Sequence, residues 1–486
     1  MSRFSRREFV KQAAAGFAVS FTIAGTKASG RVLGANEVVR LGVAGIRGRG
    51  SEHIRAFAKI PGVQITHLID PDRRLFESRS AQVKQLGGNT PKCFQDIRKA
   101  LEDKELDAIS IATCNHWHSL MTIWACQAGK DVYVEKPASQ VMSEGRKCLE
   151  AARKYGRIVQ HGTQSRSDRK WAIAVAAARS GKYGKLLVSK GYASKPRWSI
   201  GFKPVKEPPP ELDFDLWLGP APKQPYHENL VHYNWHWFWD TGNGEIGNQG
   251  VHQMDIARWV IGNRLPKSVV SLGGRWVNEP NFKDQGQTPN MQLTVLDFGD
   301  VLLVFEVRGL VGKKGRDGKD IPPQVTNEFY CEEGMITAGG FYPKGKDKPE
   351  PLGDFEIDIK PGDHFANFIQ AVRSRKVEDL NADILHGHLS SALCHLGNIS
   401  YRLGSQVPFS QTPAGVPMDV PQVRASWDAI QKNLRNALDI DLSKATYTLG
   451  PKLAFDPEKE KFVDNPKADA LLTRPPRPPF VVPEKV

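Results

Sequence analysis

One pattern near the N-terminus of this 486-residue chain constrains its fold most strongly. Residues 38–44 form an apolar run that predicts a buried strand, and the glycine-rich stretch GIRGRG, residues 45–50, follows it. A helical pattern covers residues 51–59, and a second apolar strand over residues 64–69 ends at Asp70. Strand, glycine turn, helix, strand and acid in this order predict a Rossmann-type unit that binds a dinucleotide.

The residue types in this unit suit a pyrophosphate and a ribose. Glycines permit a tight turn and a close approach of the backbone, and the helix N-terminus offers free N–H groups. Asp70 lies where a carboxylate would meet the ribose hydroxyls, and an acid there repels a 2′-phosphate. NAD is therefore predicted rather than NADP, although Arg73 and Arg74 weaken this preference.

The glycine motif departs from its usual form at one position. Arg47 stands where the second glycine is expected, and Gly48 comes one residue late. A plain tight turn before a helix is therefore an alternative reading. The alternation that follows favours the dinucleotide site, because strands are predicted over residues 106–112 and 132–134 with a helix over 119–128 between them. Such alternation predicts a doubly wound parallel sheet.

Two polar stretches follow strands of this sheet at their carboxyl ends, where doubly wound sheets bind ligands. The first is CNHWH, residues 114–118, and the second is EKP, residues 135–137. Each has a purely structural alternative. Asn115 could cap a helix, and Glu135 with Lys136 could be a salt pair before a turn.

The pattern changes after residue 160. Helices are predicted over residues 168–180, 362–375 and 383–403, and strand-like runs predict a largely antiparallel sheet. Those runs are residues 186–192, 268–276, 291–298 and 301–307. The predicted fold is α/β: a Rossmann domain over residues 36–160, then an α+β domain with a large, mostly antiparallel open sheet over 161–445, then an extended Pro-rich tail over 446–486.

Two stretches of the second domain are rich in candidate site residues. In HYNWHWFWD, residues 232–240, alternate tryptophans would share one face of an extended segment and could stack on a sugar, although a core stripe is the alternative. His232 and His236 also admit a metal site, a less favoured reading, and no metal is predicted. In GNQGVHQMD, residues 247–255, His252 and Asp255 lie three apart on one helix face, which a core histidine would also explain.

The stretches ATCNHWH and AGKDVYVEKPAS resemble the Gfo/Idh/MocA family, named for glucose–fructose oxidoreductase and inositol dehydrogenase. The resemblance implies that Lys136 lies beside the nicotinamide and the substrate hydroxyl. Many dehydrogenases of this family carry D-x-x-x-H-x-x-D, whose last two places match His252 and Asp255. The first place holds Asn248 here, which can hydrogen-bond a sugar hydroxyl but cannot take a proton. Cys114 stands where similar members have proline.

The resemblance implies an NAD-dependent oxidoreductase of a sugar, polyol or glycoside. His252 would be the general base with a pKa near the operating pH, Lys136 would stabilise the alkoxide, and Asn248 and Asp255 would orient substrate and histidine. The predicted cofactor-binding residues are Gly45, Ile46, Arg47, Gly48, Arg49, Gly50, Asp70, Asn115, His118, Glu135 and Lys136, and the predicted substrate contacts are Trp235, Trp237, Gln164 and Arg166.

Two other functions remain open from the sequence. A redox-assisted glycoside lyase or hydrolase would oxidise a sugar transiently and reduce the product on the same NAD. A non-catalytic carbohydrate-binding protein is supported only by Arg47 and Asn248. A homo-oligomer formed through the C-terminal sheet is also expected.

The first 30 residues predict an export signal. SRREFVK, residues 5–11, looks like a twin-arginine motif, and the apolar run 13–25 is too short to span a bilayer. That pathway carries folded proteins, so a periplasmic or cell-envelope protein loaded with its cofactor in the cytoplasm is expected, with the export machinery as a partner. Six cysteines without a C-x-x-C pair predict reduced, buried thiols rather than a disulfide framework. The net charge of +14 comes without a dense basic block, so no nucleic-acid partner is predicted.

Overall fold

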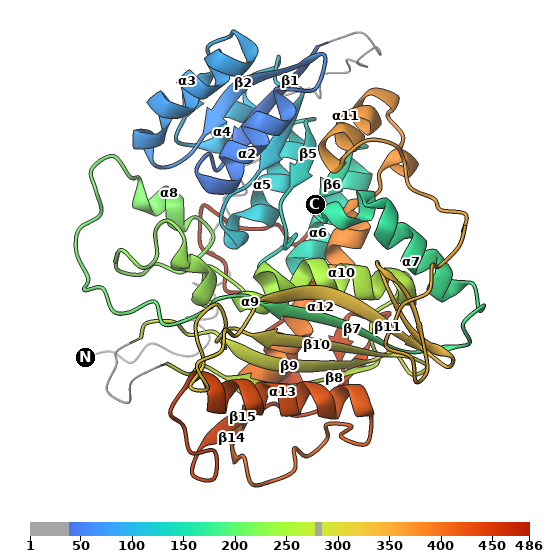
Figure 1. The fold of residues 1–486 in the computed structure, drawn as a ribbon. Helices are drawn as coiled ribbons and strands as arrows, with labels where there is room; N and C mark the ends of the chain where they lie inside the picture. The colour runs from blue at the N-terminus through green and yellow to red at the C-terminus, as the bar shows by residue number, and fades with distance from the viewer. Residues whose placement is uncertain (1–37, 278–283) are drawn as a thin grey trace, which may run out of the picture.

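The computed structural model describes residues 38–277 and 284–486, which form two sheets with their helices (Figure 1). The proposed export signal lies outside the described residues. Within the described part of the chain no helix is long and apolar enough to span a bilayer. All six cysteines are free thiols; Cys93 is exposed and Cys114 is half-buried, whereas the other four are buried as predicted.

The first sheet has six parallel strands in the order β3-β2-β1-β4-β5-β6, which confirms the predicted doubly wound domain. Its strands are β1 (Val39–Ala44), β2 (Val63–Ile69), β3 (Lys92–Phe94), β4 (Ala108–Ile111), β5 (Asp131–Val134) and β6 (Val159–His161). The connecting helices are α2 (Gly48–Phe57), α3 (Phe76–Gly87), α4 (Ile97–Leu101), α5 (Asn115–Gln127) and α6 (Met142–Lys154). Strand order reverses between β1 and β4, so a crevice opens at their carboxyl ends.

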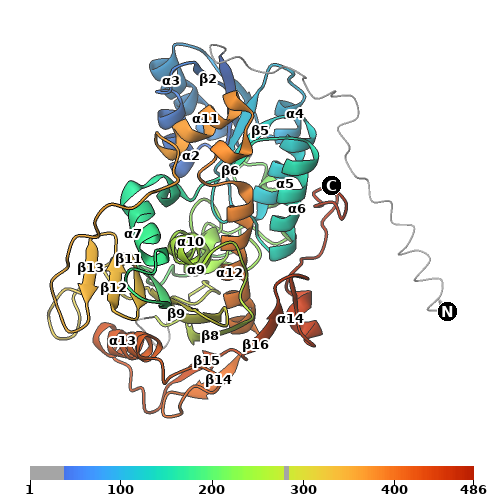
Figure 2. The same ribbon diagram turned by 90° about the vertical axis from the view of Figure 1, so that its right-hand side faces the viewer.

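A helix from much later in the chain completes the core of the first domain. Helix α11 (His364–Ser374) places Phe365, Phe368 and Val372 against residues of β1 and α2, among them Leu41 and Phe57. Figure 2 shows α11 beside the strands of the first sheet. The predicted boundary at residue 160 therefore leaves out a segment that this core needs.

The second sheet has 11 strands and is antiparallel except where β10 pairs with β7. The four predicted strands are present as β7 (Leu186–Ser194), β8 (Ser268–Gly274), β9 (Met291–Asp297) and β10 (Leu302–Arg308). The others are β11 (Gln324–Cys331), β12 (Gly334–Thr337), β13 (Gly340–Pro343), β14 (Ser405–Pro408), β15 (Thr446–Leu449), β16 (Leu453–Asp456) and β17 (Lys461–Phe462).

Helices cover both faces of this sheet (Figure 1). One face carries α10 (Gly250–Ile261) and α12 (Ile384–Arg402), and α7 (Arg169–Arg179) packs against α10. On the opposite face α13 (Pro421–Ala437) packs Trp427, Ile430 and Leu434 onto apolar residues of β8, β9 and β10. The sequence predicted self-association through the C-terminal sheet, and over β8, β9 and β10 such an interface would have to displace α13.

The C-terminal segment is more structured than the predicted extended tail. Strands β15 and β16 pair with β8, and α14 (Pro466–Ala470) follows them. The chain then returns to the first domain, where the ring of Phe480 lies 5.4 Å from that of Trp117. The residues after α14 form neither a helix nor a strand, and they connect the C-terminal segment to the first domain.

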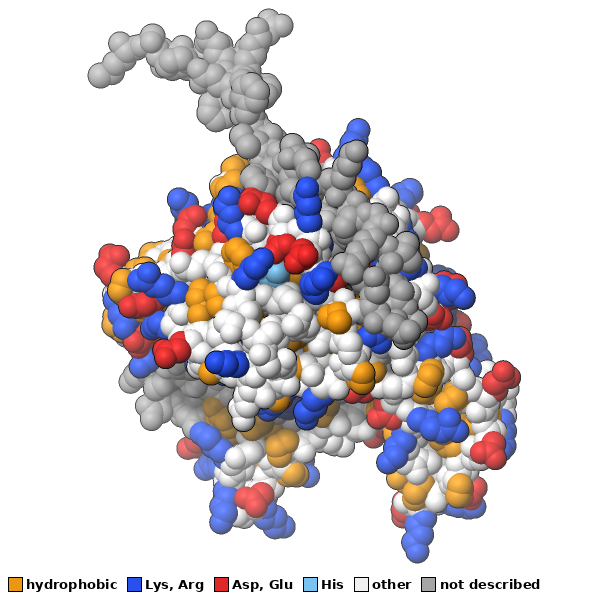
Figure 3. Space-filling model, turned by 90° about the horizontal axis from the view of Figure 1, so that it is seen from above, with side chains coloured by type: hydrophobic (Ala, Val, Ile, Leu, Met, Phe, Trp, Pro, Cys, Tyr) orange, Lys and Arg blue, Asp and Glu red, His pale blue; other side chains and the backbone are white. Residues whose placement is uncertain are grey.

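Charged side chains of both signs are interspersed over the face of the molecule seen in Figure 3. Side chains of Lys and Arg on that face form no continuous stripe among the residues drawn in colour.

Candidate active site

A cavity of about 640 Å³ lies between the carboxyl ends of the first sheet and a segment of the second domain. The first domain contributes the glycine turn, Asp70, Asn115 and Lys136 to its wall. The second domain contributes Trp217, Asn248 and the aromatic segment 232–236. The cavity is therefore placed at the topological switch point, as the sequence predicted for a dinucleotide.

The glycine turn could accommodate a side chain at one of its glycines but not at the two others. Gly45 has φ +77°, and a Cβ there would lie 2.6 Å from the carbonyl oxygen of Ala112. A Cβ on Gly50 would lie 1.8 Å from the carbonyl oxygen of Gly45. A Cβ on Gly48 would meet nothing within 4 Å. Gly45 and Gly50 are thus required by the fold, whereas the displaced Gly48 faces the open cavity.

A dinucleotide fits the residues at this end of the cavity. Helices α2 and α5 both begin at the cavity wall, so their unpaired N–H groups and positive dipole ends face the same space. The Asn115 side chain is buried there, and its Nδ2 has no hydrogen-bond partner among the described residues. A pyrophosphate or ribose oxygen would satisfy such a donor.

Alanine replacements in the turn separate these two roles. Gly50→Ala is expected to destabilise the first domain, because the added methyl group collides with backbone. Gly48→Ala is expected to keep the melting temperature of the cofactor-free protein within about 1 °C but to weaken dinucleotide binding about tenfold or more, since the methyl group enters the cavity. Melting curves and titrations with NAD would test both. Equal NAD affinity for Gly48→Ala and wild type would contradict a pyrophosphate at this turn.

Asp70 holds the turn and also faces the cavity. Its carboxylate accepts hydrogen bonds from the backbone N–H groups of Ile46 and Asp72, both at 3.0 Å. Burial raises its pKa to about 6 in spite of these bonds. The neighbouring Arg74 pairs with Asp72 at 2.6 Å. Its charge is therefore already compensated, so Arg74 does not favour the 2′-phosphate of NADP.

Lys136 and Asn248 meet in the cavity although 112 positions separate them in the sequence. The Lys136 ammonium donates to the Asn248 backbone carbonyl at 2.9 Å and lies 3.3 Å from its Oδ1. Burial lowers the pKa of Lys136, while Glu135 and Glu245 oppose that shift. The structure thus brings together two of the four predicted catalytic side chains.

Two predicted cofactor-binding residues hold the loops around Lys136. Glu135 pairs with Arg49 at 2.6 Å and with His53 at 3.1 Å. The ring nitrogens of His118 lie 2.6 Å from the carbonyl oxygen of Pro137 and 3.1 Å from that of Thr113. Both side chains line the cavity, but their polar atoms serve the protein itself.

His252 differs from its predicted electrostatic state. It lies in the first turn of α10, half-buried, and burial together with Lys136 lowers its pKa to about 3. The expected pKa near the operating pH is therefore wrong: the nearby ammonium and the loss of solvent outweigh Glu135 and Asp255. At neutral pH the imidazole is uncharged.

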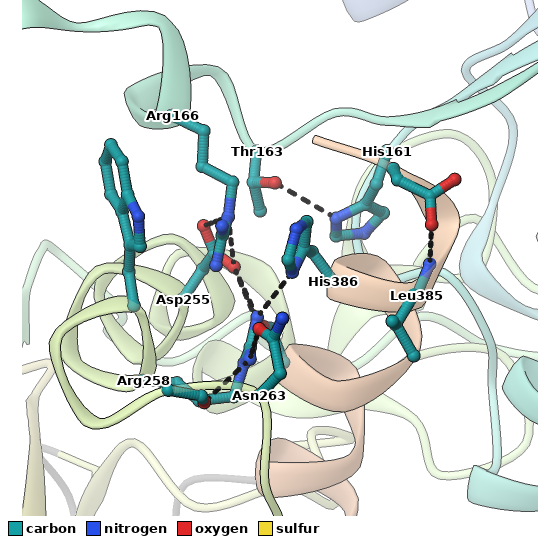
Figure 4. A network of polar contacts seen from close by, with 12 residues as sticks. His161, Thr163, Arg166, Asp255, Arg258, Asn263, Leu385 and His386 are labelled. Atoms are coloured by element: carbon teal, nitrogen blue, oxygen red, sulfur yellow. Dashed lines mark hydrogen bonds and ion pairs between the residues drawn. The ribbon is translucent and has the colours of Figure 1, made fainter. Parts of the chain in front are cut away.

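Asp255 belongs to a separate buried network (Figure 4). Its carboxylate accepts from Arg166 Nε at 2.8 and 3.0 Å and from Ser390 Oγ at 2.6 Å. Although burial favours the neutral acid, Arg166 and Arg258 lower its pKa to about 2. No hydrogen bond to His252 is found among the described residues, so Asp255 holds arginines rather than the predicted histidine.

The aromatic segment is helical rather than extended. Residues Asn234–Trp237 form a 3-10 helix, so the extended segment that would have placed alternate tryptophans on one face is not formed. Trp235 lines the cavity together with Tyr233 and His236, which the sequence did not single out as contacts. Trp237 is buried beneath Arg197, whose guanidinium lies 5.1 Å from its ring.

The remaining predicted residues are dispersed. Gln164 borders neither cavity described here, and Arg166 lines a second cavity rather than this one. His232 Nε2 lies 2.8 Å from Asp72, and His236 Nδ1 lies 2.6 Å from the carbonyl oxygen of Tyr233. The two histidines therefore serve different partners and do not converge on a common point.

Comparison with known proteins agrees with this architecture. Residues 39–163 match the family described as "Oxidoreductase family, NAD-binding Rossmann fold", and residues 183–271 match its "C-terminal alpha/beta domain". A crystal structure of the WlbA dehydrogenase from Bordetella pertussis in complex with NADH and UDP-GlcNAcA superposes with a TM-score of 0.54 at 17% identity, covering 74% of this chain and 95% of that one. At that identity the likeness establishes the fold alone.

Two curated relatives are also similar over parts of the chain. The scyllo-inositol 2-dehydrogenase (NAD(+)) of Bacillus subtilis is 27% identical over 262 residues, which are 54% of this chain and 64% of the relative. A glycosyl hydrolase family 109 protein of Shewanella pealeana is 25% identical over 182 residues, 36% of this chain and 40% of the relative. The chain thus spans less than two thirds of either relative. The two family models match in chain order, so residues 39–163 are similar to the NAD-binding domain and residues 183–271 to the C-terminal domain of the Gfo/Idh/MocA oxidoreductases.

Proposed function

We propose that this protein is an NAD-dependent oxidoreductase that acts on a CH–OH group of a sugar, polyol or glycoside. The observation that carries the proposal is the position of the Lys136 ammonium, 2.9 Å from Asn248, in the cavity that begins at the glycine turn. Sugar- and inositol-directed proteins among the relatives support the substrate class.

NAD would be held by the backbone of the glycine turn, by Asp70 at a ribose and by Asn115, and it would supply the hydride acceptor. Asp70 favours NAD over NADP because a carboxylate beside the ribose hydroxyls would repel a 2′-phosphate. Trp235 and Tyr233 offer aromatic surface to the substrate from the second domain.

Lys136 is best placed to take the hydroxyl proton. Burial lowers the pKa of Lys136, which favours loss of its proton, and its side chain lines the cavity. Burial and Lys136 lower the pKa of His252 to about 3, which makes its imidazole a weak base. The Asn248 amide lines the same cavity and would orient the hydroxyl, whereas neutral His252 lies near Lys136 but is not among the residues that line the cavity. The base role predicted for His252 thus passes to Lys136.

The pH dependence of kcat/KM distinguishes the two bases. With Lys136 as base, activity in the oxidation direction rises with pH as the ammonium loses its proton, with a midpoint below the ordinary lysine value of 10.5. His252→Asn is expected to lower the rate while leaving this midpoint unchanged. If kcat/KM of His252→Asn no longer rises with pH, His252 is the base instead of Lys136.

The first test is the cofactor content of the purified protein. Denaturing the protein and measuring the supernatant by mass spectrometry is expected to yield NAD rather than NADP, in up to stoichiometric amount. Purified protein that contains no dinucleotide and also fails to bind added dinucleotide would contradict the proposal and favour a carbohydrate-binding protein.

A redox-assisted glycoside lyase or hydrolase is the second candidate, favoured by the similarity to glycosyl hydrolase family 109 proteins. In that reaction NAD is reduced and reoxidised within one turnover. Cleavage of a glycoside by the NAD-loaded protein without an added electron acceptor would support it. Net accumulation of NADH with an intact glycosidic bond would support the dehydrogenase.

We further propose export through the twin-arginine pathway after the cofactor has been loaded. The support is the SRREFVK motif and a candidate cofactor cavity that lies between two domains. Replacing Arg6 and Arg7 with lysines is expected to retain the protein in the cytoplasm with its NAD content unchanged. Unaltered export of this variant would contradict the assignment.

A further inference from the structure

A second cavity of about 520 Å³ lies near the C-terminal end of α10, apart from the catalytic one. Its wall includes Arg166, Arg179, Trp259, Asn263, Lys360 and His386. Asn248 precedes α10 and lines the first cavity, whereas Trp259 and Asn263 lie at the other end of this 12-residue helix, about 18 Å away.

Arg166 is held rigidly at this cavity with unused hydrogen-bonding capacity. Its Nε binds both oxygens of Asp255, and its guanidinium lies 5.2 Å from the ring of Trp259. The side chain is only 4% exposed, and its Nη2 has no hydrogen-bond partner among the described residues. A buried guanidinium N–H without a partner is costly, so an acceptor in this cavity would be strongly favoured.

The inner wall carries more positive than negative charge. Figure 4 shows Arg166 of the wall and Arg258 behind it beside Asp255, the one carboxylate among the described residues that pairs with these arginines. His386 adds no charge, because burial and the two arginines lower its pKa to about 2. Arg179 lies close enough that Arg166 lowers its pKa, after the larger effect of burial. The carbonyl groups that end α10 accept from Arg179 and Arg258, but a helix end supplies only about half a negative charge.

The acidic residues of the outer wall do not cancel this excess. Glu356, Asp358 and Glu378 are exposed, and Asp358 pairs with Lys360 at 3.1 Å. Among the described residues, no carboxylate is found to raise the pKa of Arg179. The inner end of the cavity therefore remains cationic.

We propose that this second cavity binds the oxyanion of a small molecule, a carboxylate or a phosphate monoester, between Arg166, Arg179 and Lys360. A planar guanidinium suits the bidentate geometry of both groups. The Arg166–Asp255 pair lies between this site and the catalytic cavity. The site is therefore independent of the redox chemistry proposed above.

Calorimetric titration of the NAD-saturated protein tests the site, because bound NAD fills the anion positions of the first cavity. Inorganic phosphate and glucuronate are the probes, at constant ionic strength in a chloride buffer, with glucose as the neutral control. Arg166 is left intact since it pairs with buried Asp255. The variants are Arg179→Gln and Lys360→Gln, and Arg169→Gln is the matched control at the exposed start of the same helix.

Saturable binding of either anion, weakened about tenfold by Arg179→Gln or Lys360→Gln but not by Arg169→Gln, is the expected result. Binding of both probes would indicate a general oxyanion site, and binding of one would identify the carboxylate or the phosphate. Absence of saturable binding of both anions, or equal weakening by Arg169→Gln, would overturn the proposal. Melting curves would establish that each variant is folded.

Discussion

Lys136→Met is expected to lower kcat by a factor of about 10²–10⁴, the usual contribution of a positioned acid–base group. Methionine fills a similar volume but neither accepts a proton nor stabilises a developing alkoxide. It also removes the hydrogen bond from Lys136 to the Asn248 carbonyl. Binding of NAD should change little, because the glycine turn, Asp70 and Asn115 remain in place.

A second buried lysine provides the control. Lys130 is 2% exposed, donates to the carbonyl oxygen of Asp103 at 2.8 Å and has a pKa lowered by burial, but it lies outside the cavity. Lys130→Met should cost stability comparable to Lys136→Met while leaving kcat near that of wild type. Equal losses of kcat in the two variants would show that Lys136 acts through the fold and not in the reaction.

The first domain could be predicted from sequence because its signals are local. Apolar runs that lie buried in a parallel sheet alternate with helices, and the glycine turn is dictated by contacts within residues 45–50 and with Ala112. The contact between Lys136 and Asn248 was not available from spacing, and the family resemblance implied only that both residues belong to the site, with Lys136 paired with His252. The structure supplies the distance that the resemblance could only imply.

The features that were missed depend on packing between distant segments. Helix α11 follows the second sheet in sequence, but its apolar face is needed by the first domain. Tryptophans alternate with other residues in segment 232–240, as in a strand. The segment instead forms a 3-10 turn in which Trp235 and Trp237 are buried at separate places. The pKa of His252 depends on its burial and on Lys136, neither of which is encoded in the D-x-x-x-H-x-x-D spacing.

Asp255→Asn is expected to reduce the free energy of unfolding by about 3–5 kcal/mol, the typical effect of removing one partner from a buried ion pair. Asparagine has the same shape but leaves the guanidinium groups of Arg166 and Arg258 without a counter-charge. Both arginines are almost completely buried, so water cannot compensate for the loss. A clear fall in the thermal unfolding temperature should report it.

An exposed ion pair gives the comparison that assigns the role of Asp255. Asp300 pairs with Arg264 at 2.7 Å while both side chains are 40% or more exposed, so Asp300→Asn should cost less than about 1 kcal/mol. If Asp255→Asn instead unfolds at the same temperature as wild type but loses activity, the carboxylate acts in the reaction, as the family pattern implies. If it melts early and keeps its activity per folded molecule, Asp255 is the counter-ion that allows two arginines to be buried behind the active site.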